Sequence, residues 1–131
     1  MEPKLITFTV PCYNSEKYMA KCIDSILDTG EKNIEIIIVN DGSKDSTGKI
    51  ADEYEKKFPE IIKVIHQENG GHGEGVNQGI RNAKGIYFKV VDSDDWLDKQ
   101  ALQKIISEIK ELKNKNQFLK PQKPCIWGSL L

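Results

Sequence analysis

Short runs of apolar, β-branched residues alternate along the chain with segments in which apolar residues recur every three or four positions. Four such runs predict buried strands, at residues 5–10, 34–39, 61–65 and 86–91. The run at 34–39 is nearly unbroken Ile and Val, which is typical of a strand covered on both faces. The pattern therefore favours a parallel sheet.

Each predicted strand is followed by a segment with the period of an amphipathic helix. Capping candidates stand before three of these segments: Asn14 and Ser15, Asp45 or Ser46, and Asp98. The first three segments are expected to end at Gly30, Pro59 and Gly85. The positions expected to be buried are Tyr18, Cys22, Ile23, Ile26 and Leu27, then Ile50, Tyr54 and Phe58, then Val76, Ile80 and Ala83, and finally Leu102, Ile105, Ile106, Ile109 and Leu112.

The alternation of strands and helices predicts an α/β fold, a parallel sheet with right-handed crossovers and helices on both faces. Ligands of such sheets bind at the carboxyl ends of the strands. Three polar clusters fall there: residues 11–14, 40–43 and 92–95. Ordinary turn chemistry explains each cluster by itself, but it does not explain why the strongest acids gather at one end of the sheet.

The most informative cluster is Asp92-Ser93-Asp94-Asp95, directly after the last apolar strand. Carboxylates crowded at a strand end repel one another and lose hydration, which favours a bound cation. Oxygen ligands of this kind suit Mg²⁺ or Mn²⁺, which share a substrate's phosphates. The alternative is a solvated acidic turn that caps the next helix.

Composition limits the classes of function. The chain has 131 residues, 38% hydrophobic and 30% charged, and a net charge of −1, as in a single globular domain. No basic block supports nucleic-acid binding. No apolar run approaches the roughly 20 residues that span a bilayer, and the N-terminal residues lack the apolar h-region of a signal peptide. We expect a cytoplasmic protein without a transmembrane segment, which leaves peripheral membrane association open.

The cysteines, Cys12, Cys22 and Cys125, are odd in number and lack C-x-x-C spacing. This pattern fits a reducing cytoplasm better than a disulfide framework. Neither His66 nor His72 stands at a metal-ligand spacing from them, so a zinc site is not expected.

Four segments in order resemble the family 2 glycosyltransferases, of the nucleotide-diphospho-sugar transferase superfamily, in their N-terminal donor-binding half. They are Val-Pro-Cys-Tyr-Asn at 10–14, Ile-Ile-Ile-Val-Asn-Asp-Gly-Ser-Lys-Asp at 36–45, the Asn-Gly-Gly to Ala-Lys-Gly region at 69–85, and Phe-Lys-Val-Val-Asp-Ser-Asp-Asp-Trp at 88–96. The resemblance extends from residue 4 to about residue 100 and depends on all four segments together.

The resemblance implies a glycosyltransferase A-type, Rossmann-like fold with a mostly parallel sheet. Residues 1–115 are then a nucleotide-sugar-binding α/β domain. Residues 116–131 are a linker, suggested by the two prolines in 120–124, or the beginning of an acceptor-binding half. Complete enzymes of the family need about another hundred residues, so we expect the fold to be incomplete at its C-terminus.

The resemblance also implies roles for individual residues. Those expected at the nucleotide are Pro11, Tyr13, Asn14, Asp41, Asp92 and Ser93, with Asp41 on the base or the ribose. The metal, Mn²⁺ or Mg²⁺, is expected on Asp92 and Asp94, while Asp95 orients the sugar or supports the metal ligands. Simpler readings stay open, namely a packing role for Tyr13, a helix cap for Asn14 and a turn residue for Asp41.

Two features depart from the family pattern. Many relatives carry Ala-Arg-Asn before the third helix, with the arginine near the phosphates, where this chain has Gly-Val-Asn at 75–77. His72 and Arg81 are the candidates to replace that cation. No general base is identified after Asp98, because Glu108 and Glu111 fall on the polar face of the last helix.

The function implied is a metal-dependent, inverting transfer of a sugar from a nucleoside diphosphate sugar, with UDP as the expected nucleotide. The acceptor is a hydroxyl of a polysaccharide or a lipid-linked glycan, as in cell-surface polysaccharide synthesis. One alternative is a nucleotide-binding module without turnover. Another is a nucleotidyltransferase that makes a sugar nucleotide, although that class expects a Gly-rich basic loop at 11–14. A receiver domain would need an aspartate on the third strand, and residues 64–66 contain none.

Overall fold

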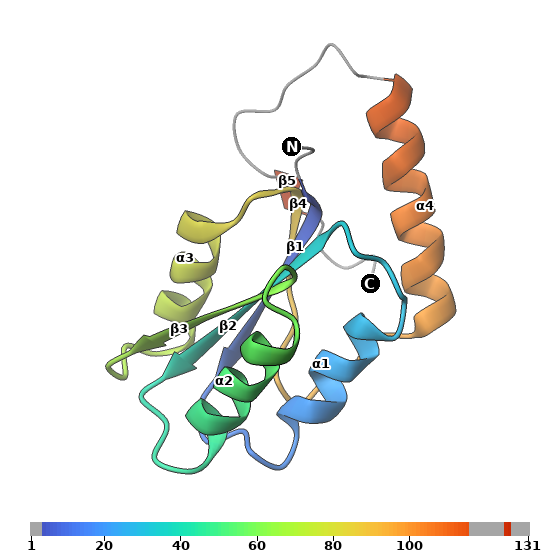
Figure 1. Cartoon of the computed structure of the whole chain (residues 1–131). Coiled ribbons are helices and arrows are strands. Elements are labelled where there is room, and N and C mark those ends of the chain that lie inside the picture. The colour runs from blue at the N-terminus through green and yellow to red at the C-terminus, as the bar shows by residue number, and fades with distance from the viewer. Residues whose placement is uncertain (1–3, 116–124, 127–131) are drawn as a thin grey trace.

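The structure is a computed structural model that describes residues 4–115 and 125–126 (Figure 1). Its strands are β1 (Lys4–Cys12), β2 (Ile34–Asp41), β3 (Ile62–Gln67), β4 (Gly85–Val90) and β5 (Cys125–Ile126). Its helices are α1 (Met19–Leu27), α2 (Thr47–Lys57), α3 (His72–Asn82) and α4 (Lys99–Lys115). Strands and helices therefore alternate as the sequence predicts.

All strand pairings are parallel, and the order across the sheet is β3-β2-β1-β4-β5. This confirms the predicted fold class. The chain reverses direction across the sheet after β3, because β4 pairs on the other side of β1. The carboxyl ends of β1 and β4 therefore lie side by side at a topological switch point, where ligands of such sheets bind. The expected linker at 120–124 lies outside the described residues.

The main core lies on one face of the sheet. Phe8 and Val10 of β1 stand in register with Ile36 and Ile38 of β2, and all four are fully buried. These side chains share one cluster with buried residues of α1, α2 and α4, among them Ile23, Ala51 and Ile106. The opposite face is covered by α3, which Figure 1 shows on the other side of the sheet from α1. Helices on both faces are thus confirmed, which explains why every residue of β2 is buried.

The first strand extends one residue beyond Pro11, where the sequence predicted its end. The Thr9 carbonyl accepts a hydrogen bond from Val91 N at 2.9 Å, so Thr9 faces β4. In a parallel strand, the backbone N–H and C=O groups of residues two apart point to the same neighbouring strand. The backbone of Pro11 therefore points to the side of β4, where the pairing with β4 has already ended. The missing N–H of proline is tolerated because no partner strand lies there.

The predicted caps have different outcomes. Asp98 is confirmed as a cap, since its Oδ2 accepts a hydrogen bond from Ala101 N at 2.8 Å. Asp45 Oδ1 accepts one from Thr47 N at 2.9 Å, at the start of α2. The capping prediction for Asn14 and Ser15 is wrong, because α1 begins only at Met19 and no side chain caps it.

Three apolar residues predicted to be buried are exposed instead: Tyr18 at 55%, Ile80 at 42% and Leu112 at 42%. Tyr18 lies before α1, and Met19 takes the buried position. Leu112 lies near the end of α4.

None of the helices in the described part of the chain has both the length and the apolar character that a membrane span requires.

The exposure of Ile80 follows from how α3 meets the sheet. The buried residues of α3 are Gly75 and Gly79, not its aliphatic side chains. A Cβ at Gly79 would overlap the side chain of Thr9, and one at Gly75 would lie 3.2 Å from Pro11 Cβ. The helix backbone therefore rests directly on β1, and residues such as Ile80 turn outward.

Replacing Gly79 by Ala is expected to destabilise the fold by about 1–3 kcal/mol, because the added methyl group must push α3 away from β1. Gly73→Ala is the matched control, since a Cβ at that position of the same helix meets nothing within 4 Å. Alanine favours a helix over glycine, so the control should be neutral or slightly stabilising. Urea unfolding of both variants measures the difference, and equal stability would contradict the proposed contact.

Candidate functional site

A pocket of about 610 Å³ lies at the carboxyl end of the sheet. The loops after β1 and β4, the end of β2 and the start of α3 surround it. Its lining includes all the predicted nucleotide and metal residues together with Cys12, Ser15, Tyr18 and His72: Pro11, Cys12, Tyr13, Asn14, Ser15, Tyr18, Asp41, His72, Asp92, Ser93 and Asp94. Segments 80 residues apart in the sequence therefore meet around one cavity.

Asn14 connects the loops that follow β1 and β2. Its side-chain Oδ1 accepts a hydrogen bond from Lys44 N at 2.8 Å, and its own N–H donates to Ser43 Oγ at 3.0 Å. Asn14 adopts φ of +48°, a left-handed conformation that asparagine tolerates better than most residues. The side chain predicted to cap a helix thus joins two loops instead, which is why α1 begins later.

Ser15 connects the loop after β1 to the start of α2 and to the loop after β4, a role that the sequence does not reveal. Its N–H donates to Thr47 Oγ1 at 2.8 Å, at the start of α2. Its hydroxyl lies 2.7 Å from that of Ser93, in the loop after β4. Ser15 is buried, so these bonds hold the loops after β1 and β4 together at the pocket.

Asp41 organises the Gly-rich segment before α3. Its Oδ1 accepts hydrogen bonds from Gly70 N at 2.7 Å and Gln67 Nε2 at 2.9 Å, and its Oδ2 accepts one from Gly71 N at 3.0 Å. Burial disfavours the ionised carboxyl, but the bonds from Gly70, Gln67 and Gly71 outweigh it and lower the pKa of Asp41 below its ordinary value. With a single bond at Oδ2, the carboxylate keeps capacity to accept another donor from the pocket.

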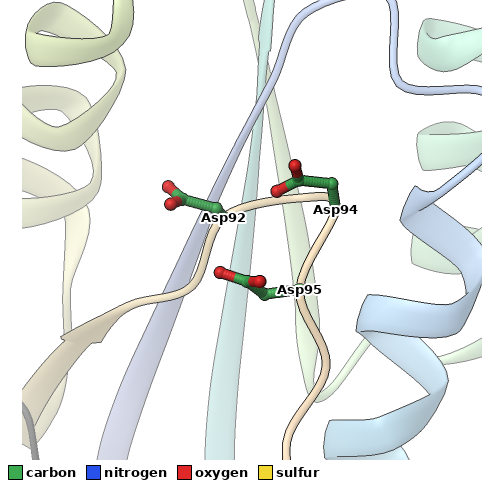
Figure 2. A group of neighbouring side chains, drawn as sticks. All are labelled: Asp92, Asp94 and Asp95. Atoms are coloured by element: carbon green, nitrogen blue, oxygen red, sulfur yellow. The ribbon is translucent and has the colours of Figure 1, made fainter.

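The acidic cluster forms because the loop after β4 folds into a tight turn. The Asp95 N–H donates to the Asp92 carbonyl at 2.9 Å, which brings the ends of the Asp-Ser-Asp-Asp segment together. One carboxylate oxygen from each of Asp92, Asp94 and Asp95 lies within 4.8 Å of the others. Figure 2 shows Asp94 and Asp95 reaching toward the side of Asp92, whose own carboxylate extends toward α3. All three are exposed.

His72 and Arg81, the two candidates to replace the arginine of the family pattern, lie in different places. His72, the first residue of α3, lies at the pocket, with its Nε2 3.1 Å from Asp92 Oδ1. Arg81 is paired with Glu74 on the outer surface of α3, with its Nη1 2.9 Å from Glu74 Oε1. Of the two, only His72 lines the pocket.

Cys12 lines the pocket with a buried thiol. Burial raises the pKa of Cys12 to about 12, so the group is neutral near pH 7. Glu108 and Glu111 are exposed on α4, as predicted, and do not line this pocket.

Comparison with known proteins identifies what the chain resembles. A sequence model of the family "Glycosyl transferase family 2" matches residues 7–118. The glycosyltransferase GlyA of Streptococcus pneumoniae is 43% identical over 106 residues, which are 81% of this chain and 15% of GlyA. The uncharacterized glycosyltransferase EpsJ of Bacillus subtilis is 42% identical over 107 residues, 82% of this chain and 31% of EpsJ. The chain thus spans less than a third of either relative.

A similar fold occurs in residues 1–349 of S. aureus TarS, which have been solved in complex with UDP-GlcNAc. The match has a TM-score of 0.72 and 32% sequence identity, and it covers 82% of this chain and 31% of that chain. The part of TarS that matches is therefore of the same size as the described α/β unit.

Asp41→Asn is expected to reduce stability at neutral pH and to have a smaller effect in acid. The folded pKa of Asp41 is lowered, so its contribution is complete above the ordinary value of 3.8 and is lost as the pH falls through the folded pKa. Urea unfolding of wild type and variant at pH 7 and near pH 3 measures the gap in unfolding free energy. A gap that stays constant or widens in acid would contradict the assignment.

Proposed function

The chain belongs to glycosyl transferase family 2, and on that premise we propose that it binds the donor of a metal-dependent, inverting glycosyltransferase. The donor is a nucleoside diphosphate sugar, with UDP as the nucleotide, and the acceptor is a hydroxyl of a polysaccharide or lipid-linked glycan. The observation that carries the proposal is the single pocket in which Pro11, Tyr13 and Asp41 face the carboxylates of Asp92 and Asp94.

One side of the pocket suits a nucleoside. Tyr13 is half exposed at 49% and offers an aromatic face to a base, next to the apolar ring of Pro11. Asp41 Oδ2 can accept a base N–H or a ribose hydroxyl. The choice of UDP is supported by TarS, a structural neighbour at 32% identity that was solved with UDP-GlcNAc.

The acidic side of the pocket fits a divalent cation. Asp92 and Asp94 would hold Mn²⁺ or Mg²⁺, and Asp95 is close enough to support them or to orient the sugar. The fit rests on the donor set, exposed carboxylate oxygens within 4.8 Å of one another beside a pocket large enough for a ligand. When bound, such a metal supplies a Lewis acid that neutralises charge on the two phosphates.

The residues of the chain orient these groups. His72 donates to Asp92 and so restrains one carboxylate on the side of α3. The helix α3 begins at the pocket, and the N–H groups of its first turn carry partial positive charge that favours a phosphate. Ser93 is held through its hydroxyl by Ser15, which keeps the acidic turn in place relative to Tyr13.

The proton-accepting base and the acceptor site are proposed to lie in parts of the enzyme beyond this unit. Three candidates among the described residues already have partners: His66 pairs with Asp52, His72 with Asp92, and Glu74 with Arg81. A nucleotide-binding module without turnover, which would use the same pocket, is the second candidate. A cytoplasmic location and a role in cell-surface polysaccharide synthesis belong to the first proposal.

Calorimetric titration is expected to show saturable binding of UDP that tightens on adding Mn²⁺. Asp94→Ala removes a metal ligand, so UDP affinity should lose most of its dependence on Mn²⁺. Asp28→Ala is the control, because it removes the same charge from an exposed residue that does not line the pocket. No UDP binding at millimolar concentration, or an unchanged Mn²⁺ effect in Asp94→Ala, would contradict the proposal.

Residues 1–131 by themselves are expected to bind UDP-sugar but to transfer the sugar very slowly. Proximity of the acceptor and proton transfer to a base each contribute orders of magnitude in rate, and the proposal places both the acceptor site and the base outside this unit. Release of UDP, measured with and without an acceptor glycan, tests this expectation. Efficient transfer would contradict it, and would point to a base among His66, His72, Glu74 or the C-terminal tail.

A further inference from the structure

A chain of hydrogen bonds connects the outer surface of α2 to the loop that follows Asp41. Asp52 of α2 lies with its Oδ1 2.8 Å from His66 Nε2, and His66 Nδ1 lies 3.0 Å from Asn40 Nδ2. The Asn40 side chain then uses its Oδ1 to accept a hydrogen bond from Ser43 N at 3.1 Å. Asn40 and His66 stand opposite each other in the pairing of β2 with β3, so the sheet itself brings them together.

The direction of every bond in this chain is fixed by its two ends. The carboxylate of Asp52 only accepts, so the proton of the imidazole must lie on Nε2 of His66. The backbone N–H of Ser43 only donates, so the oxygen of the Asn40 amide must face it. The Asn40 NH₂ group therefore points at His66 Nδ1, which must be the unprotonated nitrogen. One tautomer of His66 satisfies all three contacts at once.

The Asn40 amide is also confined from the side. A Cβ on Gly48, in the first turn of α2, would lie 2.8 Å from Asn40 Nδ2 and 3.5 Å from His66 Cε1. Asn40 is only 9% exposed, whereas the side chains of His66 and Asp52 are 47% and 59% exposed. The series of hydrogen bonds thus runs from the exposed pair of Asp52 and His66 to the buried amide of Asn40, and from there to the 41–44 loop.

The same loop is the partner of Asn14. Ser43 Oγ accepts from Asn14 N, and Lys44 N donates to Asn14 Oδ1. If the bond from Ser43 N to Asn40 were lost, the 41–44 loop would loosen. It would then hold the pocket residues Tyr13 and Asn14 in place less firmly.

We propose that His66 is a positioning residue for the nucleotide site, which acts by accepting a hydrogen bond from Asn40 and so holding the Asn40 carbonyl on Ser43 N. His66 does not line the pocket and touches no substrate. Its effect on ligand affinity rests on the proposed function, whereas its effect on the loop does not. The essential feature of His66 is an acceptor at the position of Nδ1, and its contact with Asp52 serves to select the tautomer.

Two substitutions separate this role from general packing. In His66→Asn, the amide oxygen can occupy the place of Nδ1 and accept from Asn40, although the contact with Asp52 is lost. In His66→Leu, the side chain fills similar space without an acceptor, so the Asn40 NH₂ is left without its partner. The two variants therefore differ mainly in the one bond that the proposal requires.

The first measurement needs no nucleotide. Hydrogen exchange of the Ser43 amide, followed by NMR on the 131-residue chain, should be about tenfold faster in His66→Leu, which corresponds to ~1.4 kcal/mol, within the range for loss of one hydrogen bond. The rate should stay near wild type in His66→Asn. The nitrogen-15 spectrum of wild-type His66 should show Nε2 protonated and Nδ1 unprotonated. The opposite tautomer, wild-type exchange in His66→Leu, or equal acceleration in both variants would each overturn the proposal.

The second measurement is titration with UDP and Mn²⁺. Affinity should fall about three- to tenfold in His66→Leu and be restored in His66→Asn. If wild type binds no UDP while the exchange pattern holds, the proposed function fails and the positioning of the loop stands. If wild type binds and neither variant changes affinity, the link between His66 and the nucleotide site is overturned. If His66→Leu does not fold, His66→Asn and the wild-type spectrum still decide the question.

Discussion

Because the strands are parallel, the loops after β1, β2 and β4 all begin at the same end of the sheet. Hydrogen bonds between these loops hold the rest of the site in place. Asn14 joins the loop after β1 to the loop after β2, and Ser15 joins it to the loop after β4. Each contact uses a backbone N–H or a short hydroxyl, which loses little side-chain entropy when it is fixed. The pocket is therefore bounded by segments that restrain one another, although each of them is irregular in structure.

The sheet was predictable because its signal is contained in neighbouring residues. A nearly unbroken apolar run such as 34–39 indicates a strand covered on both faces, and the helical segments between the strands favour parallel crossovers. The position of the candidate site followed from the same reasoning, since polar residues directly after Val10, Val39 and Val91 must meet where these strands end. The individual roles of Pro11, Tyr13, Asn14, Asp41, Asp92, Ser93 and Asp94 in binding remain predictions.

The details that the sequence did not reveal all depend on partners distant along the chain. From the sequence, both Asn14 and Ser15 look like helix caps. Only the fold shows that Asn14 binds the backbone of Lys44 and that Ser15 contacts Ser93, which is 78 residues away in the sequence. His66 reads as an isolated imidazole because its partners belong to two other elements, α2 and β2. Such contacts are set by the pairing register and by helix packing, which no local pattern encodes.

The contact between α3 and β1 has a consequence for how this chain can vary. A helix usually tolerates change on its polar face and resists it on its aliphatic face. In α3 the surface that meets the sheet is bare backbone at Gly75 and Gly79, and the aliphatic residue Ile80 faces solvent. Substitutions should therefore be tolerated at Ile80, although it is hydrophobic, and should not be tolerated at Gly75 and Gly79, which have no side chain. Hydrophobicity by itself would misjudge which positions of this helix are constrained.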